Sequence, residues 1–136
     1  MATFTLDDLQ AALGDKFKLE RFGDDQANVV YDGGGIGFIG LEDNLIESEI
    51  AVTGYSQGES VDEDKAREIM AELKGQYESA GFSVSGSGSI SEHWYQKDPD
   101  AKYPHIEFEV TQKFDSLDDA VRILKWLSDN EHQLMR

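Results

Sequence analysis

Hydrophobic residues recur at helical spacing in three segments of the chain. The first begins at Thr5 and ends at Gly14, the second runs from a capping box at Ser60 to Gly81, and the third follows Asp115 or Ser116. N-cap chemistry before an apolar stripe is typical of a helix, and a glycine commonly ends one. The stripes consist of Leu6, Leu9 and Leu13; of Ala66, Ile69, Met70, Leu73, Tyr77 and Ala80; and of Leu117, Ala120, Val121, Ile123, Leu124, Trp126 and Leu127.

Apolar and polar residues alternate between these segments, which is the pattern of half-buried strands. Turn-forming residues separate the first four alternating segments, so hairpins and antiparallel pairing are expected. Near the C-terminal end, the loop Asp98–Pro104 is expected to reverse the chain before a last strand. The predicted strands are residues 16–22, 27–31, 36–41, 46–52, 82–91 and 105–114.

Residues 82–91 combine strand-like alternation with a glycine and serine composition. Gly86 to Ser89 taken alone has the composition of a flexible linker. However, Phe82, Val84 and Ile90 keep the two-residue period across the glycines, which favours a strand with a row of serine hydroxyls on one face.

The resulting order of elements is α-β-β-β-β-α-β-β-α. Strands joined by hairpins and covered by helices on one face make an α+β fold, here with three helices and an antiparallel sheet of about five to six strands. A chain of 136 residues suits one hydrophobic core. We therefore expect a single α+β domain over residues 1–136.

The net charge of the chain limits the classes of partner that this domain can bind. It has 28 acidic and 12 basic side chains, a net charge of −16 and no cysteine. Such a surface repels phosphates, so direct nucleic-acid binding is not expected, and disulfides and cysteine-ligated metals are excluded. The acids are spread along the chain, and Lys outnumbers Arg by 8 to 4, which argues against a salt-adapted composition.

The beginning of the chain carries no targeting signal. Residues 1–8 have neither the basic nor the apolar region of a secretory signal, and no apolar stretch is long enough to span a membrane. A cytoplasmic location without membrane contact is therefore the expectation.

A glycine motif, Gly35 to Gly40, matches G-x-G-x-x-G after a predicted strand. In dinucleotide-binding proteins this motif opens a helix whose N-terminus faces the pyrophosphate. Here Leu41-Glu42-Asp43-Asn44 follows, with turn-forming and acidic residues where the anion would lie. We interpret the motif as a glycine-rich turn with an edge or bulged strand, and predict no cofactor.

Three histidines and nearby glutamates form the one group that could hold a metal or transfer protons. His105, Glu107 and Glu109 alternate on one predicted strand, Glu92-His93 lies across the hairpin, and His132 is near the end of the chain. Alternating Glu is also typical of a solvated strand face, and the histidines lack helical ligand spacing. We predict no metal site and no catalytic residue.

The predicted binding residues are aromatic and acidic. Trp94, Tyr95 and Tyr103 flank the predicted hairpin loop, and Trp126 widens the stripe of the last helix. Tryptophan and tyrosine are frequent in binding hot spots, although both also pack at strand ends. The acidic candidates are Glu47, Glu49, Glu107 and Glu109, which alternate on two predicted strands.

The order of elements and the acidity resemble those of the type III secretion chaperones and the YbjN-like proteins. The strand Ile46 to Val52 departs from that pattern, which has one strand fewer before the long helix. The resemblance implies a small acidic dimer that binds another protein and has no catalytic residue. We therefore expect a non-enzymatic, chaperone- or adaptor-like module with a protein partner, which the charge favours to be basic.

Two other functions stay open. An immunity, anti-defence or nucleic-acid-mimic protein would present its strand carboxylates to a phosphate-binding groove. A small metal- or nucleotide-dependent enzyme would use His93, His105 and Glu107.

Overall fold

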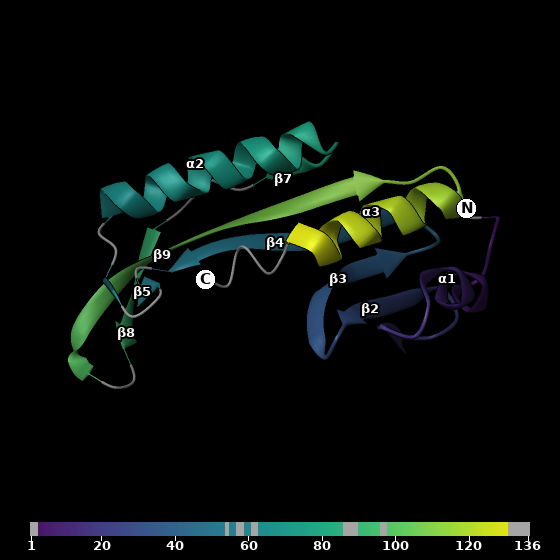
Figure 1. The fold of residues 1–136 in the computed structure, drawn as a ribbon, viewed down its shortest axis with the longest axis horizontal. Coiled ribbons are helices and arrows are strands. Elements are labelled where there is room, and N and C mark those ends of the chain that lie inside the picture. The colour runs from purple at the N-terminus through teal and green to yellow at the C-terminus, as the bar shows by residue number, and fades with distance from the viewer. Residues whose placement is uncertain are drawn as a thin grey trace. The chain divides into compact units, whose positions relative to one another are not determined.

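The computed structural model describes residues 3–53, 55–56, 59–60, 63–85, 90–95 and 98–130, and within residues 50–63, 65–66 and 90–107 it describes the backbone. Figure 1 shows the elements. In chain order they are α1 (Leu6–Leu13), β1 (Phe17–Arg21), β2 (Gln26–Tyr31), β3 (Gly34–Gly40), β4 (Leu45–Thr53), β5 (Tyr55–Ser56), β6 (Glu59–Ser60), α2 (Glu63–Ser79), β7 (Ser83–Ser85), β8 (Ile90–Tyr95), β9 (Asp98–Lys113) and α3 (Leu117–Asn130).

These elements form an α+β fold with an antiparallel sheet, as predicted. In the described residues there are three helices and one sheet of seven strands, in the order β1-β2-β3-β4-β9-β7, with β8 also paired to β9. The short strands β5 and β6 pair separately and were not predicted. The order of the helices and of the main strands agrees with the prediction, because hydrophobic periodicity is the most direct sequence signal of secondary structure.

The described residues fall into two compact units. Those of 1–48 and 111–132 form the first unit, and those of 49–110 form the second. The strands β4 and β9 each contribute residues to both units.

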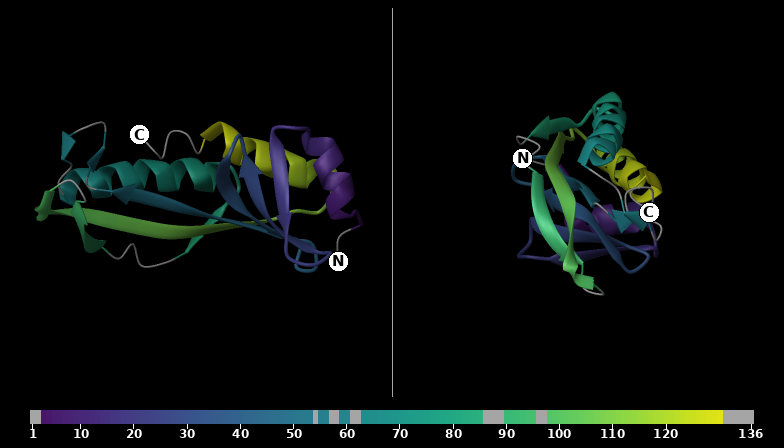
Figure 2. Two further views of the ribbon diagram at one scale, coloured as in Figure 1. Left: turned by 90° about the horizontal axis from the view of Figure 1, so that it is seen from below. Right: turned by 90° about the vertical axis from the view of Figure 1, so that its left-hand side faces the viewer.

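The core of the first unit lies between two helices and one face of the strands. α1 contacts β1, α3 contacts β3, and the two helices contact each other, as Figure 2 shows. The side chains that alternate inward on the strands are buried, as the pattern predicted. The fully buried large side chains of this unit are Leu6, Leu9, Val29, Ile39, Ile46, Ile123, Leu124 and Leu127.

Both helices of this unit begin at the caps that the sequence predicted. The Thr5 hydroxyl accepts a hydrogen bond from the Asp8 N–H (3.1 Å), and the Asp8 carboxylate accepts one from the Thr5 N–H (3.0 Å). At α3, the Ser116 hydroxyl accepts from the Asp119 N–H at 3.1 Å. Each hydroxyl satisfies a backbone donor that the helix leaves unpaired, which fixes where the helix starts.

The Asp119 carboxylate adds a second set of bonds at this cap. It accepts hydrogen bonds from Arg122 Nη2 (2.7 Å) and Nε (3.1 Å) and from the Asp115 N–H (3.3 Å). The bonds from the Arg122 side chain are the main reason that the pKa of Asp119 is lowered from 3.8. The ionised carboxylate is therefore favoured by folding.

The glycine motif lies inside a strand. Gly35 to Gly40 belongs to β3, and a turn follows it where a dinucleotide site would need a helix. The register with β2 shifts between Val29 and Val30, which face Gly37 and Gly35, so Ile36 is the extra residue of a bulge. The strand and bulge interpretation is confirmed.

The outer edge of β1 is covered by one side chain of α1. Gln10 Nε2 donates to the Phe17 carbonyl at 2.7 Å, and Gln10 Oε1 accepts from the Leu19 N–H at 3.2 Å. The amide thus bonds to a strand as a neighbouring backbone would. β1 is the last strand in the sheet order, and such edges are sites of unwanted pairing.

In the second unit, α2 packs on strand residues through its predicted stripe. Met70 and Tyr77 are buried, and the Tyr77 ring meets that of Phe82 edge to face at 5.5 Å. The Lys74 ammonium lies 5.8 Å from the centre of the Phe108 ring, within reach of a cation–π interaction. The side chains of the predicted capping box at Ser60 lie outside the described residues.

The prediction of a loop at Asp98–Pro104 was wrong. These residues belong to β9, which pairs antiparallel with β8 up to Tyr95↔Asp98. Pro104 pairs with Glu92, while Pro99 lies where the register jumps from Trp94↔Lys102 to Tyr95↔Asp98. Proline fixes φ near a value that extended backbone tolerates, so it does not by itself mark a turn.

The prediction of one strand over 82–91 is confirmed only at its flanks, because β7 covers Ser83–Ser85 and β8 begins at Ile90. Gly86 to Ser89 lies outside the described residues.

Gly37 and Gly35 provide a matched test of the bulged strand. A Cβ on Gly37 would lie 2.6 Å from the Glu47 carbonyl oxygen, whereas a Cβ on Gly35 would meet nothing within 4 Å. We expect Gly37→Ala to lower the free energy of unfolding by about 1–3 kcal/mol and Gly35→Ala to change it by less than about 0.5 kcal/mol, both measured by urea denaturation. Equal losses in the two variants would contradict this register.

The Asp119 cap predicts a pH dependence of stability. Because folding lowers the pKa of Asp119 from 3.8, its contribution is complete above that value and is lost as the pH falls through the lower folded-state pKa. Asp119→Asn should cost about 1 kcal/mol at pH 7, and the gap from the wild type should close in strong acid. Urea denaturation at a series of pH values measures this difference in the free energy of unfolding. Asp118→Asn, in the same helical turn, is the control. A gap independent of pH would exclude this origin.

Gln10→Met removes the amide while it keeps the length of the side chain. We expect a loss of about 1–2 kcal/mol, because the Phe17 and Leu19 backbone groups lose their partner, and self-association through the opened β1 edge. Light scattering after size-exclusion chromatography measures the association. Asp8→Ala is the control, since it weakens α1 at its cap and leaves the amide in place. If Asp8→Ala self-associates as strongly as Gln10→Met, exposure of the β1 edge is not the cause of the association.

Candidate functional site

The helices of the first unit leave the opposite face of its strands open. We call this the outer face and define it by Lys18, Glu20, Phe22, Asn28, Val30, Phe38 and Glu47. Lys18, Glu20 and Asn28 are exposed, whereas their neighbours Leu19 and Val29 point into the core. The outer face therefore follows directly from strand alternation, with one side of each strand in the core and the other in water.

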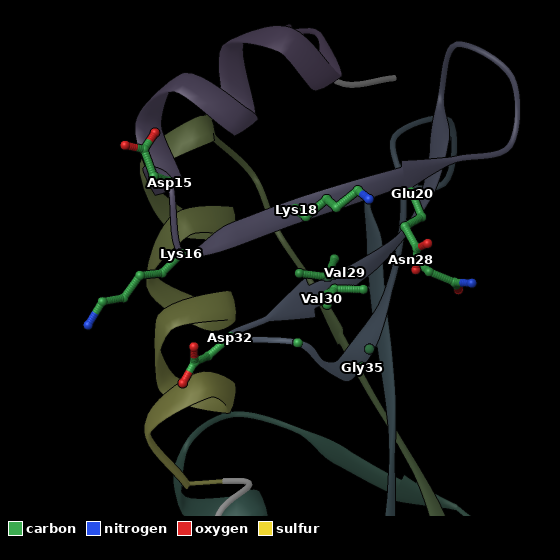
Figure 3. Close-up of a pocket in the computed structure, with 11 residues that line it drawn as sticks. Asp15, Lys16, Lys18, Glu20, Asn28, Val29, Val30, Asp32 and Gly35 are labelled. Carbon is green, nitrogen blue, oxygen red and sulfur yellow. The ribbon is translucent and has the colours of Figure 1, made fainter.

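A hollow of about 780 Å³ lies on part of the outer face. Figure 3 shows that Glu20 and Asn28 lie side by side at one end, while Asp15, Lys16 and Asp32 lie at the other. Gly33 of the turn and Gly35 and Gly37 of β3 line it. A Cβ on Gly33 or Gly35 would meet nothing within 4 Å, so these glycines leave space that larger residues would fill. The hollow contains both signs of charge, so it favours no single small ion.

The turn beside this hollow has the geometry that its sequence requires. Asp32 has φ 49° and Gly33 has φ 85°, which are the values of a two-residue type I′ hairpin turn. The turn holds β2 and β3 in register at the hollow.

The strand registers align four outer-face residues in one row. Glu20 faces Asn28, Asn28 faces Phe38, and Phe38 faces Glu47. With neighbouring strands about 4.8 Å apart, the two Glu positions lie about 14 Å from each other. The row thus has a carboxylate at each end and an aromatic ring and an amide between them.

An aromatic side chain stands beside this row. The Phe22 ring lies 6.5 Å from the Phe38 ring, and Phe22 is 55% exposed, the one exposed large hydrophobic residue in the described part of the chain. The Phe22 N–H donates to the Gln26 carbonyl at 2.8 Å, which holds the residue at the end of its hairpin. Gly23 comes next in the chain, followed by the acidic turn residues Asp24 and Asp25.

Trp126 of the predicted binding residues is on α3. It is half-buried beside the buried stripe of that helix, and its carbonyl accepts a hydrogen bond from Asn130 Nδ2 at 2.8 Å. This position widens the apolar face of α3, as the sequence indicated.

The other predicted aromatic residues belong to one hairpin. Trp94 and Tyr95 are in β8 and Tyr103 is in β9, where Trp94 pairs with Lys102 and Tyr103 pairs with His93. The backbone therefore brings the three positions close together, while their side chains lie outside the described residues.

The predicted acidic residues lie on β4 and β9. Glu47 and Glu49 on β4 and Glu109 on β9 are exposed, and Glu107 is described by its backbone. Glu47 belongs to the outer-face row, and the Glu109 carbonyl accepts a bond from the Ser85 hydroxyl at 3.4 Å. The prediction that these Glu alternate with inward residues is confirmed for Glu47, whose neighbour Ile46 is fully buried.

The histidines and glutamates of the alternative metal site are only partly described by the structure. His93 and His105 are on paired strands, but His105 faces Ser91 and His93 faces Tyr103, so the two are not directly opposite. Their side chains and His132 lie outside the described residues. Among the residues whose side chains are described, no three His, Asp or Glu come together as a metal site would require.

Phe22 and the row that it adjoins were not predicted from the sequence. Phe22 shares the two-residue period of Lys18 and Glu20, so its phase already placed it on the polar face of the strand. That signal could have identified it. The row depends on three strand registers, one of which is shifted by a bulge, and these cannot be derived from periodicity alone.

Comparison of the chain with protein-family models, with curated protein sequences and with solved structures found no match. None of the helices in the described part of the chain is long and apolar enough to cross a membrane.

Proposed function

We propose that this protein is a non-enzymatic, acidic binding module that engages a protein partner through the outer face. The observation that carries the proposal is the exposed Phe22 ring beside Phe38. The two rings form one apolar patch, and a partner that covers apolar surface removes it from water, which favours association. Phe22 is 55% exposed, so covering it contributes about half of the roughly 1.5–3 kcal/mol that burial of a whole phenylalanine side chain gives.

The surroundings of this ring favour a basic partner. Glu20 and Glu47 lie in the adjoining row, Asp24 and Asp25 follow Phe22, and the whole chain carries a net charge of −16. A negative field raises the rate at which a positive surface finds its site, while the apolar contact slows dissociation. The proposed module acts in the cytoplasm, and its adaptor- or chaperone-like role agrees with the resemblance of its topology and acidity.

The proposal predicts that partner capture depends on Phe22. The wild-type chain, Phe22→Ser and Phe22→Tyr are used as baits in extracts of the native cell, and bound proteins are quantified by mass spectrometry. A partner should be recovered with the wild type and with Phe22→Tyr, which keeps the ring, and should fall at least about tenfold with Phe22→Ser. Circular dichroism checks that each bait is folded.

Other outcomes would replace the proposal. A partner that is lost with Trp126→Ala and kept with Phe22→Ser would place the interface on α3. Loss only when Glu47, Glu49, Glu107 and Glu109 become Gln, with steep weakening by salt, would indicate the nucleic-acid mimic. A rise of the melting temperature with a nucleotide or a divalent metal would indicate the enzyme.

A further inference from the structure

The row of outer-face residues has a spacing that defines what the partner must carry. Glu20 and Glu47 end the row, and two intervening strands separate them. Both side chains are exposed, so their positions follow from the strand registers and from the strand spacing, which gives about 14 Å.

An extended peptide matches this spacing when its charges are four residues apart. Consecutive residues of an extended chain advance about 3.3 Å, so positions i and i+4 lie about 13 Å apart and point to the same side. The residue at i+2 points to that side as well. It would lie over the middle of the row, where Phe38 and the adjacent Phe22 offer apolar contact.

The charges facing the row favour cations at both ends of that peptide. Glu20 and Glu47 are carboxylates, Asp24 and Asp25 extend the negative charge on the Phe22 side, and Lys18 is the one base in the outer face as defined above. Lys18 and Glu20 both line the hollow, and the two Glu and two Asp residues outweigh this single base. Guanidinium groups also stack on aromatic rings, so Arg suits both features.

Two other occupants fit less well. A second copy of this chain would bring another acidic face against the first, since each chain carries −16. A nucleic acid would bring phosphates to the carboxylates. Both meet like-charge repulsion, whereas a basic protein segment meets attraction.

Resting on the proposed function, we propose that the outer face binds an extended segment of the partner that lies across β1 to β4. In this segment two Arg or Lys residues, four positions apart, flank an apolar residue. The flanking cations contact Glu20 and Glu47, and the apolar residue contacts Phe38 and Phe22.

Nuclear magnetic resonance with the full chain, labelled with ¹⁵N, tests this inference. The probe is a peptide of sequence Ser-Arg-Thr-Leu-Thr-Arg-Ser with both ends blocked. Its matched control, Ser-Thr-Arg-Leu-Arg-Thr-Ser, has the same composition and charge, with the two Arg residues only two positions apart. We expect the amide signals of Asn28 and Phe38 to shift, and the probe to bind at least about threefold more tightly than its control.

Variants separate the row from the general charge of the protein. Glu47→Gln should weaken binding of the probe about threefold to tenfold and remove its advantage over the control peptide. Asp118→Asn removes the same charge on α3 and should leave that advantage intact. The dispersion of the amide signals shows whether each variant is folded.

Equal affinity for the two peptides, or equal effects of Glu47→Gln and Asp118→Asn, would overturn the inference. The proposed function would still stand if capture of the native partner depended on Phe22. If capture did not depend on Phe22 while the spaced peptide still bound the row, the proposed function would fail and the peptide preference alone would remain.

Discussion

The first unit depends on burial of two helices against a single face of its strands. α1 contacts β1, α3 contacts β3, and the two helices contact each other. Leu6 and Leu9 of α1 and Ile123, Leu124 and Leu127 of α3 are fully buried. Burial of each such side chain contributes roughly 1.5–3 kcal/mol. Because both helices pack on this side, the opposite side of the same strands carries the exposed Glu20, Asn28 and Glu47 and the half-buried Phe38.

The glycines of β3 serve this arrangement in more than one way. At Gly37 the absence of a side chain admits the Glu47 carbonyl, so β3 and β4 come together where any larger residue would collide. The bulge at Ile36 shifts the register by one residue and still keeps Ile36 and Ile39 in the core. The shift decides that Phe38 lies between Asn28 and Glu47. A motif that resembles a dinucleotide-binding loop in sequence therefore acts as a bulged strand that sets the register of the outer face.

Local signals predicted the elements well, and long-range pairing explains where they failed. The Thr5 and Ser116 caps follow from contacts within a few residues. The buried side of β1 and of β2 follows from the two-residue period of the apolar positions. Asp98–Pro104 has the composition of a turn, but pairing with β8 holds these residues in a strand. Of the candidate site, Glu47 was predicted and Phe22 was not, because Trp and Tyr are the residues most frequent in binding hot spots, whereas Phe22 is distinguished only by a strand phase that places it outward.

The sequence by itself determined the class of fold, the order of its elements, the caps of two helices and the acidity of the surface. All of these depend on the period of apolar residues, on neighbours three or four positions apart, or on composition. Only the tertiary structure decided that Gln10 covers the edge of β1 and that Glu20, Asn28, Phe38 and Glu47 share one row. These relations join residues that are distant in the chain, so they exist only after strand register and helix packing have been fixed together.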